Sequence, residues 1–417
     1  MNKMWDAIVV GGGLAGWIAG IRAAQRGKKV LLVTEGVGTL FNFSGIFDYG
    51  QVERLRHLPK HPYTLFNSQA IAQGKHFVQA LCPEYVVNDA PQSALTVLGT
   101  VRQGDLMPSN MILPDRQEQG EFVLLVPEGL KDFFPEIVVA NIAREFPGWQ
   151  VSEKRMQVKA LAEWTRLGKS VSSIDYANIW RSEQGQTALS HEIDEIKRQH
   201  QEAGKSQGKI IVVLPSLVRE YFDASRTKPY QKEFSLPVLE MSSFVPSPHG
   251  RYFAEYLKHV FSDLGGELMI GARAVSLSGN GEPTSENQVK SCRELTVQSM
   301  GKSMLLKGKK YILATGGLLG GGIKVGMVRK SIREGVFNLP LFVPKEWSET
   351  QFFAPQPFAQ IGVETDGLLR PIDPEHGQLV WDNVHVVGRM LAHWDPWTQK
   401  CGGGVSITSG YAAAELI

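Results

Sequence analysis

The sequence has few cysteines, and their positions restrict the classes of protein it could encode. Its 417 residues include three cysteines, Cys82, Cys292 and Cys401, and no two of them have CxxC or metal-ligand spacing. An odd number of distant thiols argues against a secreted disulfide framework, and an iron–sulfur cluster normally needs four ligands. We therefore expect no metal site, and we expect a reducing compartment, the cytoplasm.

Net charge and long apolar runs are also lacking. Lysine and arginine number 44 and aspartate and glutamate 42, a formal net charge of +2. There is no basic run with interleaved aromatic residues, so nucleic-acid binding is not expected. No stretch reaches the roughly 18 apolar residues of a transmembrane helix, and the N-terminus lacks the apolar core of a secretory signal. Any contact with a membrane should then be peripheral or made through a partner.

Glycine is the residue in excess, and its first cluster has a recognisable spacing. The chain has 43 glycines, about a tenth of its residues against an average near 7%. Gly11, Gly13 and Gly16 form GxGxxG between two apolar runs, residues 7–10 and 30–33, which predict buried parallel strands. In that context the motif predicts a dinucleotide pyrophosphate at the start of a helix that opens with Leu14 and Ala15.

Two further glycine elements follow predicted strands late in the chain. The run 311–317 ends in Thr315, Gly316 and Gly317, where a chain leaves a sheet beside a bound dinucleotide. The third element is a strand at 384–387 followed by a glycine-led helix. We expect its cofactor-binding residues to be Gly388, Arg389, Gly402, Gly403, Gly404 and Val405. Free amides and a positive dipole at such a helix start suit the pyrimidine oxygen of a flavin.

These elements together predict an α/β fold in two parts. A discontinuous Rossmann-like flavin-binding domain is expected at 1–114 plus 241–417, with a second α/β domain inserted at 115–240. Within the insertion, the runs 121–126 and 209–214 predict buried strands. Residues 130–145 predict a helix with an inner face formed by Leu130, Phe133, Phe134, Ile137 and Val138. The insertion is expected to cap the flavin or to dock a partner.

The order of these elements resembles flavoproteins of the fumarate reductase and succinate dehydrogenase type. The tail resembles more closely the B-subunit family of the anaerobic glycerol-3-phosphate dehydrogenases. The resemblance rests on GGGLAG at 11–16, FSGIFD at 43–48, LGTVR at 98–102, GLKDF at 129–133, PSPHGR at 246–251 and DPWTQKCGGGV at 395–405. It extends over nearly the whole chain, loosely at 145–235. It adds Ser44 and Gly45 to the expected cofactor residues.

The resemblance implies a heteromeric, quinone-dependent oxidoreductase of anaerobic respiration. Such a complex oxidises glycerol 3-phosphate to dihydroxyacetone phosphate. A larger catalytic flavoprotein subunit is the expected first partner. An iron–sulfur subunit is the second; it docks the complex at the inner face of the cell membrane and passes electrons to quinone. The alternatives are a stand-alone fumarate-reductase-like flavin oxidoreductase and a non-redox interaction subunit that keeps the flavoprotein fold.

The identity of the flavin is open between FMN and FAD. In FAD proteins of this fold the second strand ends in an acid that binds the adenosine ribose. That position is Thr34, and the acid comes one residue later, as Glu35, which could reach the ribose only if the strand has already ended. Arg389 stands where an acid for the ribityl chain is usual. Both departures, and the family, favour FMN, whereas GxGxxG suits a pyrophosphate that FMN lacks; FMN is our expectation and FAD the alternative.

Two residues are candidates for catalysis. His393 could act as a base near a carbinol, because the pKa of an unperturbed histidine lies near neutrality. Arg251 could bind the phosphate of a substrate. The competing interpretation is structural: His393 as a hydrogen-bonding loop residue and Arg251 as the start of a helix. If this subunit only relays electrons, it needs no base.

Overall fold

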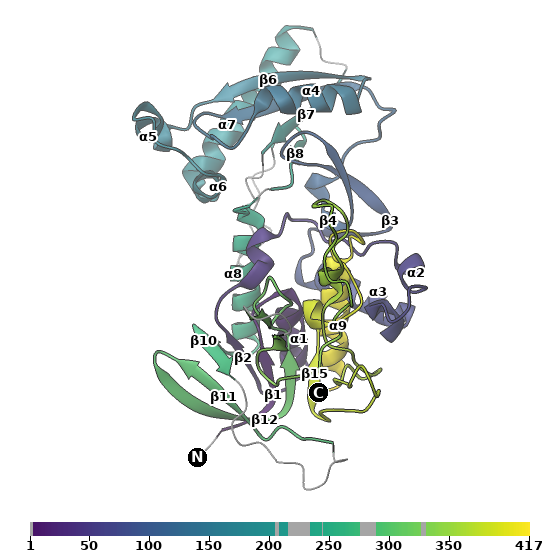
Figure 1. Cartoon of the computed structure of the whole chain (residues 1–417). Helices are drawn as coiled ribbons and strands as arrows, with labels where there is room; N and C mark the ends of the chain where they lie inside the picture. Colours follow the sequence, from purple (N-terminus) through teal and green to yellow (C-terminus); the bar gives the residue numbers. More distant parts are fainter. Residues whose placement is uncertain (1–2, 205–207, 216–233, 244, 276–288, 327–330) are drawn as a thin grey trace. The chain divides into compact units, whose positions relative to one another are not determined.

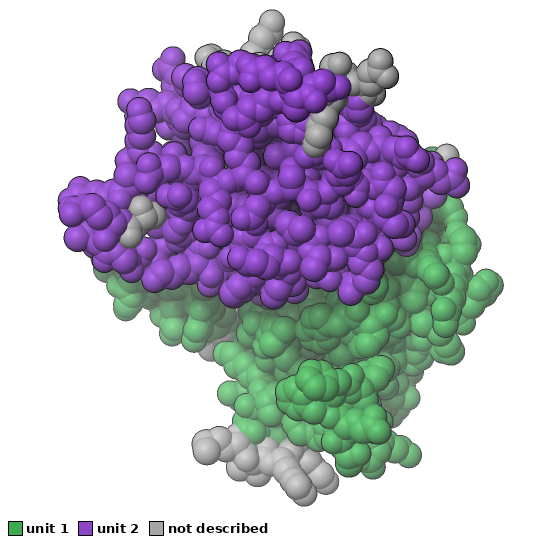
Figure 2. Space-filling model, turned by 90° about the horizontal axis from the view of Figure 1, so that it is seen from above, with its two compact units in different colours: residues 1–40, 47–80, 257–417 green, residues 41–46, 81–256 purple. Residues whose placement is uncertain are grey.

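The computed structural model describes residues 3–204, 208–215, 234–243, 245–275, 289–326 and 331–417. They form two compact units (Figure 2). The first comprises residues 1–40, 47–80 and 257–417, and the second residues 41–46 and 81–256. The second unit thus begins earlier in the sequence than the insertion expected at 115–240, and those domain boundaries stay a prediction.

The first unit is built on a seven-stranded sheet. Its strands are β1 (Met4–Val10), β2 (Val30–Thr34), β9 (Glu267–Ile270), β10 (Ala272–Val275), β11 (Glu294–Ser299), β12 (Lys302–Leu313) and β15 (Val384–Val386). The strand order is β10-β11-β12-β1-β2-β9, and β15 pairs with β12. The strands β9, β2, β1, β12 and β15 are parallel, whereas β10 and β11 add an antiparallel edge. The predicted α/β class with a parallel sheet is confirmed.

Helices cover this sheet, and the best buried of them come from opposite ends of the chain. Among the described residues, three helices lie wholly within the first unit: α1 (Leu14–Gln25), α2 (Val52–Leu55) and α9 (Gly402–Glu415). Helix α3 (Ser68–Leu81) belongs to the same unit except for its last residue. Helices α1 and α9 lie side by side (Figure 1), and a Cβ on Gly410 would meet the Ala15 carbonyl. A small hairpin of β13 (Ile323–Val325) and β14 (Ile332–Glu334) completes the unit.

The opening β1–α1–β2 segment folds as its residue pattern predicts. Residues 7–10 and all of β2 are buried, because a central parallel strand is covered on both faces. Nine of the twelve residues of α1 are buried, and their small side chains allow the helix to approach the sheet closely. Gly27 ends the helix with a φ of 75°, a conformation that glycine adopts without strain.

The second unit contains a four-stranded parallel sheet and a separate hairpin. The sheet order is β6 (Trp149–Met156), β5 (Gly120–Pro127), β7 (Lys209–Leu214) and β8 (Val238–Glu240). The hairpin is β3 (Tyr85–Leu95) with β4 (Val101–Pro108). The helices are α4 (Pro135–Glu145), α5 (Ala162–Arg166), α6 (Ser173–Trp180), α7 (Glu183–Glu202) and most of α8 (Pro248–Asp263). One apolar cluster contains Phe122, Leu124 and Ile142, and another contains Val123, Leu125 and Ile193, so both faces of β5 are buried.

One helix of the second unit was predicted wrongly in its start and in part of its inner face. Helix α4 begins at Pro135, not at residue 130, because proline suits the first position of a helix. Of the residues expected to face inward, Phe133 and Val138 are buried, whereas Phe134 and Ile137 are 51% and 49% exposed. The strands at 121–126 and 209–214 are confirmed. Within the part of the chain that the structure describes, no helix is long and apolar enough to cross a membrane.

Candidate functional site

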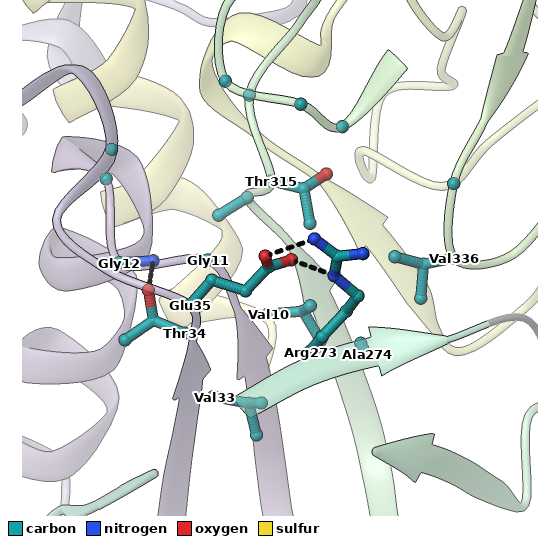
Figure 3. A pocket seen from close by; sticks show the side chains of 18 of the residues that line it. Val10, Gly11, Gly12, Val33, Thr34, Glu35, Arg273, Ala274, Thr315 and Val336 are labelled. Carbon is teal, nitrogen blue, oxygen red and sulfur yellow. Dashed lines mark hydrogen bonds and ion pairs between the residues drawn. The ribbon is translucent and has the colours of Figure 1, made fainter. Parts of the chain in front are cut away.

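A cavity of about 270 Å³ opens at the carboxyl ends of β1 and β2 (Figure 3). Such a position, at the ends of parallel strands, is where open α/β sheets bind their ligands. Its lining comes from five segments of the first unit: residues 10–13, 33–39, 272–274, 314–322 with Lys324, and 335–336. Segments some 300 residues apart therefore form one site.

The three motif glycines have separate structural reasons to be glycine. A Cβ on Gly11 would lie less than 3.0 Å from the Ala314 carbonyl, and the φ of Gly11 is 118°. A Cβ on Gly16 would collide with the Gly11 carbonyl. At Gly13, by contrast, a Cβ would meet nothing within 4 Å. The chain therefore keeps the space beside Gly13 open, as the close approach of a pyrophosphate requires.

The start of α1 is suited to an anion. Gly13 is its N-cap, no side chain caps the helix, and its first turn contains no acidic residue. The first amides of a helix have no acceptor within it and carry its positive dipole end. Because Leu14 and Ala15 begin the helix beside the open face of Gly13, their amides would hold a phosphate oxygen.

Thr34 and Glu35 have different roles: Thr34 is structural, and Glu35 presents its side chain to the cavity. Strand β2 ends at Thr34, so the condition on which Glu35 could reach a ribose is met. The Thr34 hydroxyl accepts a hydrogen bond from the Gly12 amide at 3.0 Å and donates one to the Gly36 carbonyl, which shapes the glycine turn. The Glu35 carboxylate lies in the cavity and forms a bidentate ion pair with Arg273 of β10, at 2.8 and 2.7 Å (Figure 3).

The opposite wall also offers polar groups. The Thr315 hydroxyl is buried and has no hydrogen-bond partner among the described residues, and Gly316 turns the chain away from the sheet with a φ of 76°. Lys324 adds a second cation to the lining. A buried polar group without a partner is costly, so the Thr315 hydroxyl is available to bond a ligand in the cavity.

A buried carboxylate supports this wall from behind. Glu334 is 2% exposed and accepts hydrogen bonds from the amides of Val336 and Phe337 at 2.7 and 2.6 Å. Burial raises the pKa of Glu334, and these amide bonds oppose the rise. By fixing the loop that begins at Gly335, Glu334 positions Gly335 and Val336 in the cavity lining.

Gly388 and Arg389 lie where β15 ends. A Cβ on Gly388 would press on the Ala15 side chain, and its φ is 64°. The Arg389 guanidinium donates to the Ala359 carbonyl and lies over the rings of Trp394 and Trp397. Burial lowers the pKa of Arg389 to about 10, and Nη1 has no partner among the described residues. Arg389 is thus a desolvated cation with an unused donor, but it does not line the cavity at the glycine motif.

The glycines at the start of α9 serve packing as well as any ligand. The Gly404 amide donates to the Asp48 carbonyl at 2.9 Å. A Cβ on Gly404 would collide with the Tyr63 hydroxyl, and one on Gly403 would press on Phe47. The helix starts at Gly402 as predicted, and Val405 is fully buried. A role of Gly402, Gly403, Gly404 and Val405 at the flavin stays a prediction.

Replacing Gly404 tests how much of this turn is structural. Gly404→Ala should lower the free energy of unfolding by about 2 kcal/mol, because the added methyl group forces the buried Tyr63 to move. Chemical denaturation checks this value. Gly402→Ala is the matched control, since its Cβ would make only an ordinary contact with Pro396. An equal loss in both variants would contradict the packing role of Gly404.

Ser44 and Gly45 belong to the second unit. The Ser44 hydroxyl accepts a hydrogen bond from Arg102 at 2.9 Å, and the Gly45 carbonyl accepts one from the buried Tyr85 hydroxyl, also at 2.9 Å. The φ of Gly45 is 94°, and a Cβ there would press on the ring of His249. Both residues thus have local structural roles, and their assignment to the cofactor stays a prediction.

The two catalytic candidates lie in different units. His393, in the first unit, contacts the Glu364 carboxylate at 2.7 Å and packs against Phe342 with the two rings tilted by 37°. Glu364 is 8% exposed and also binds Lys60 at 2.8 Å. Arg251, in the second unit, contacts Glu255 one helical turn away at 3.4 Å. These partners agree with the structural interpretation of both residues, and their catalytic roles stay predictions.

Sequence reasoning missed Arg273 and Lys324, which line the cavity, and Glu334, which supports the lining from behind. None of the three belongs to a recognised motif, although Lys324 follows the glycines at 320–322 by two residues. The three cysteines are buried and free, and burial raises the pKa of Cys292 and Cys401 to about 12. No group of histidine, cysteine and acidic residues within the described ranges could hold a metal ion.

Comparison with known proteins agrees with this geometry. The model of the FAD binding domain matches residues 6–82, the part of the chain with the glycine motif and Glu35. The B subunit of the anaerobic glycerol-3-phosphate dehydrogenase of Yersinia enterocolitica is 28% identical to the chain, over 99% of this chain and 98% of that one. Its counterpart from Vibrio vulnificus is 24% identical, over 99% and 95%.

The predicted resemblance is confirmed. The chain is similar over almost its full length to anaerobic glycerol-3-phosphate dehydrogenase B subunits, and its glycine motif lies in the part that is similar to the FAD binding domain. Among solved structures, the 3-ketosteroid Δ1-dehydrogenase of Sterolibacterium denitrificans aligns over 100% of this chain and 99% of that one. That alignment has 13% identity and a TM-score of 0.44.

Proposed function

We propose that the chain is the flavin-bearing B subunit of an anaerobic glycerol-3-phosphate dehydrogenase. The complex would oxidise glycerol 3-phosphate to dihydroxyacetone phosphate. A larger catalytic flavoprotein subunit and an iron–sulfur subunit are the proposed partners; the latter carries electrons to quinone at the inner face of the cell membrane. The observation that supports this most is the near-full-length similarity to B subunits together with the glycine-lined cavity.

We also propose that the flavin is FAD, in place of the FMN expected from the sequence. The cavity provides for the two parts that FMN lacks, a pyrophosphate and an adenosine ribose. The open face of Gly13 and the start of α1 suit the pyrophosphate. Glu35, beyond the end of β2, suits the ribose hydroxyls. The FAD binding domain match over residues 6–82 supports the same choice.

In this proposal the backbone amides and side chains that line the cavity bind and orient the cofactor. Bound flavin supplies the capacity to accept and pass on electrons. The amides of Leu14 and Ala15 hold phosphate oxygens, and Glu35 accepts hydrogen bonds from ribose hydroxyls. Arg273 keeps the Glu35 carboxylate extended across the cavity. The unpartnered Thr315 hydroxyl donates a further hydrogen bond.

Omission of single subunits tests the functional proposal. The three subunits are produced together, and glycerol 3-phosphate oxidation is followed with a dye acceptor and with a quinone. We expect quinone reduction to require this chain, because it would carry a flavin on the electron path. A complex that reduces quinone equally well without the chain, or with a flavin-free chain, would contradict the proposal and favour the non-redox alternative.

Substitution of Glu35 tests the identity of the flavin. Glu35→Gln should weaken FAD binding about 10- to 150-fold, because a hydrogen bond to a charged acceptor contributes about 1.5–3 kcal/mol. FMN binding should not change. Flavin released by acid and the quenching of flavin fluorescence on reconstitution measure the two effects.

The control for Glu35→Gln is Glu267→Gln on β9. Glu267 also forms an exposed ion pair, with Lys3, but it lies outside this cavity. The Glu267→Gln substitution should leave the binding of both FAD and FMN unchanged. If Glu35→Gln weakened FMN and FAD equally, or if the released flavin were FMN alone, the choice of FAD would be wrong.

A further inference from the structure

A loop of the first unit presents two phenylalanines to solvent. Phe352 and Phe353 are 85% and 96% exposed, and their rings pack edge to face with centroids 5.0 Å apart. Adjacent phenylalanines exposed to this degree are costly in water, since burying such a side chain is worth about 1.5–3 kcal/mol. Exposed apolar groups of this kind mark interaction sites.

The loop that carries them is closed at its base and braced inside. The Phe358 amide donates to the Trp347 carbonyl at 2.8 Å, which brings the ends of residues 347–358 together. The Gln356 side chain accepts from the Glu349 amide and donates to the Gln351 carbonyl, each at 2.9 Å. We call residues 347–358 the Ω-loop, because compact surface loops with adjoining ends have this form and are frequently functional.

Two features make the Ω-loop a preorganised binding element. Pro355 and Pro357 reduce its freedom before binding, so little conformational entropy remains to be lost on association. Its C-terminal end is fixed to the connection between β15 and α9. There, Arg389 donates to the Ala359 carbonyl, and the His393 amide donates to the Gln360 carbonyl at 3.0 Å.

The charge around the loop decides between a protein and a membrane. From residue 345 to 358 the charged residues are Lys345, Glu346 and Glu349, a net charge of −1. Anionic lipid surfaces attract segments rich in lysine and arginine, which this segment is not. A segment with two exposed phenyl rings and a net negative charge instead fits a protein pocket that is apolar at its centre and basic at its edge.

We propose that the Ω-loop is the docking element for a sister subunit of the complex, with Phe352 and Phe353 inserted into an apolar pocket of that subunit. The inference rests on the proposed function, since B subunits by their name act in an assembly. The inference adds to the proposed function the surface and the residues through which the assembly would form. Paired aromatic residues at the centre of an interface commonly dominate its affinity.

Binding of the purified full-length chain to each sister subunit tests the proposal. Phe352→Ser/Phe353→Ser should weaken binding to one of the two subunits at least about 30-fold. Its flavin content should not change, because neither ring contributes to the core. Hydrogen exchange of the 347–358 amides should slow in the wild-type complex. Met300→Ser is the matched control, a 95% exposed apolar residue outside the Ω-loop.

Three other outcomes would overturn the proposal. Wild-type and doubly substituted chains that bind both subunits equally would show that the docking surface lies elsewhere. Flotation of the wild-type chain with phosphatidylglycerol vesicles, abolished by the double substitution, would make the loop a membrane anchor. A wild-type dimer that the double substitution dissociates would make it a self-association surface. A chain without flavin would count against the proposed function alone, because docking is measured separately.

Discussion

A chain carrying Gly13→Ala is expected to fold as the wild type does and to be purified without flavin. The φ of Gly13 is −80° with a ψ of 177°, which alanine adopts freely, and the added Cβ would meet no atom of the chain within 4 Å. The methyl group would instead occupy the space where a pyrophosphate approaches the start of α1. We expect flavin affinity to fall about 100-fold, the cost of a displacement of about 1 Å at a preorganised site.

Absorbance of the purified protein near 450 nm, which is typical of oxidised flavin, and a thermal unfolding curve check both halves of this expectation. Gly367→Ala is the matched control, since a Cβ there also meets open space but lies outside the cavity. Full flavin content in Gly13→Ala would mean that no pyrophosphate lies against Gly13. A large loss of stability would mean that Gly13 is needed for the fold itself.

The stability of the first unit should fall steeply in mild acid, and His61 should account for a measurable part of the fall. His61 is fully buried; its Nδ1 accepts a hydrogen bond from the Tyr63 amide at 3.1 Å, so the ring is neutral. Burial lowers its pKa from 6.5 to about 4. Between pH 6.5 and 4 the unfolded chain therefore binds a proton that the folded chain does not bind. The free energy of unfolding decreases over that range as the pH falls.

The expected size of this effect is about 3 kcal/mol, from a shift of about 2.5 units at 1.36 kcal/mol each. His61→Asn removes the titrating group and keeps an acceptor for the Tyr63 amide. The free energy of unfolding is measured by chemical denaturation at pH 7.5 and pH 4. Its decrease should be about 3 kcal/mol smaller in the variant. Buried His249 and His385, whose pKa values are also lowered by burial, remain in both proteins. An equal decrease in both would contradict the assignment.

The glycine motif and its flanking strands could be predicted because their signals are local. A continuous apolar run, three glycines at fixed spacing and a second apolar run all lie within residues 7–33, and each element is adjacent in space to the next. The same holds for the start of α9, where glycines directly precede an apolar helix. Local patterns of this kind determine which backbone atoms face a ligand.

The partner of Glu35 could not be predicted, because it is 238 positions away in the sequence. Arg273 is brought to the cavity by the pairing of β10 with β11 and of β11 with β12. The hairpin of β3 and β4 was missed for another reason. Its register shifts between Val87 and Gln92 around Pro91, so the strict alternation of a strand is lost. Phe134 and Ile137 were misplaced because the helical phase starts anew at Pro135.

The pairing of β1 with β12 has a consequence for how the protein is made. The ribosome has to add about 300 residues after β1 before β12 emerges, which takes roughly 15–60 s at about 5–20 residues per second. Until then the apolar β1 lacks one neighbour and the cavity lacks the wall at 314–322. The nascent chain must therefore be protected from aggregation during synthesis, and flavin can be loaded only when translation is nearly complete.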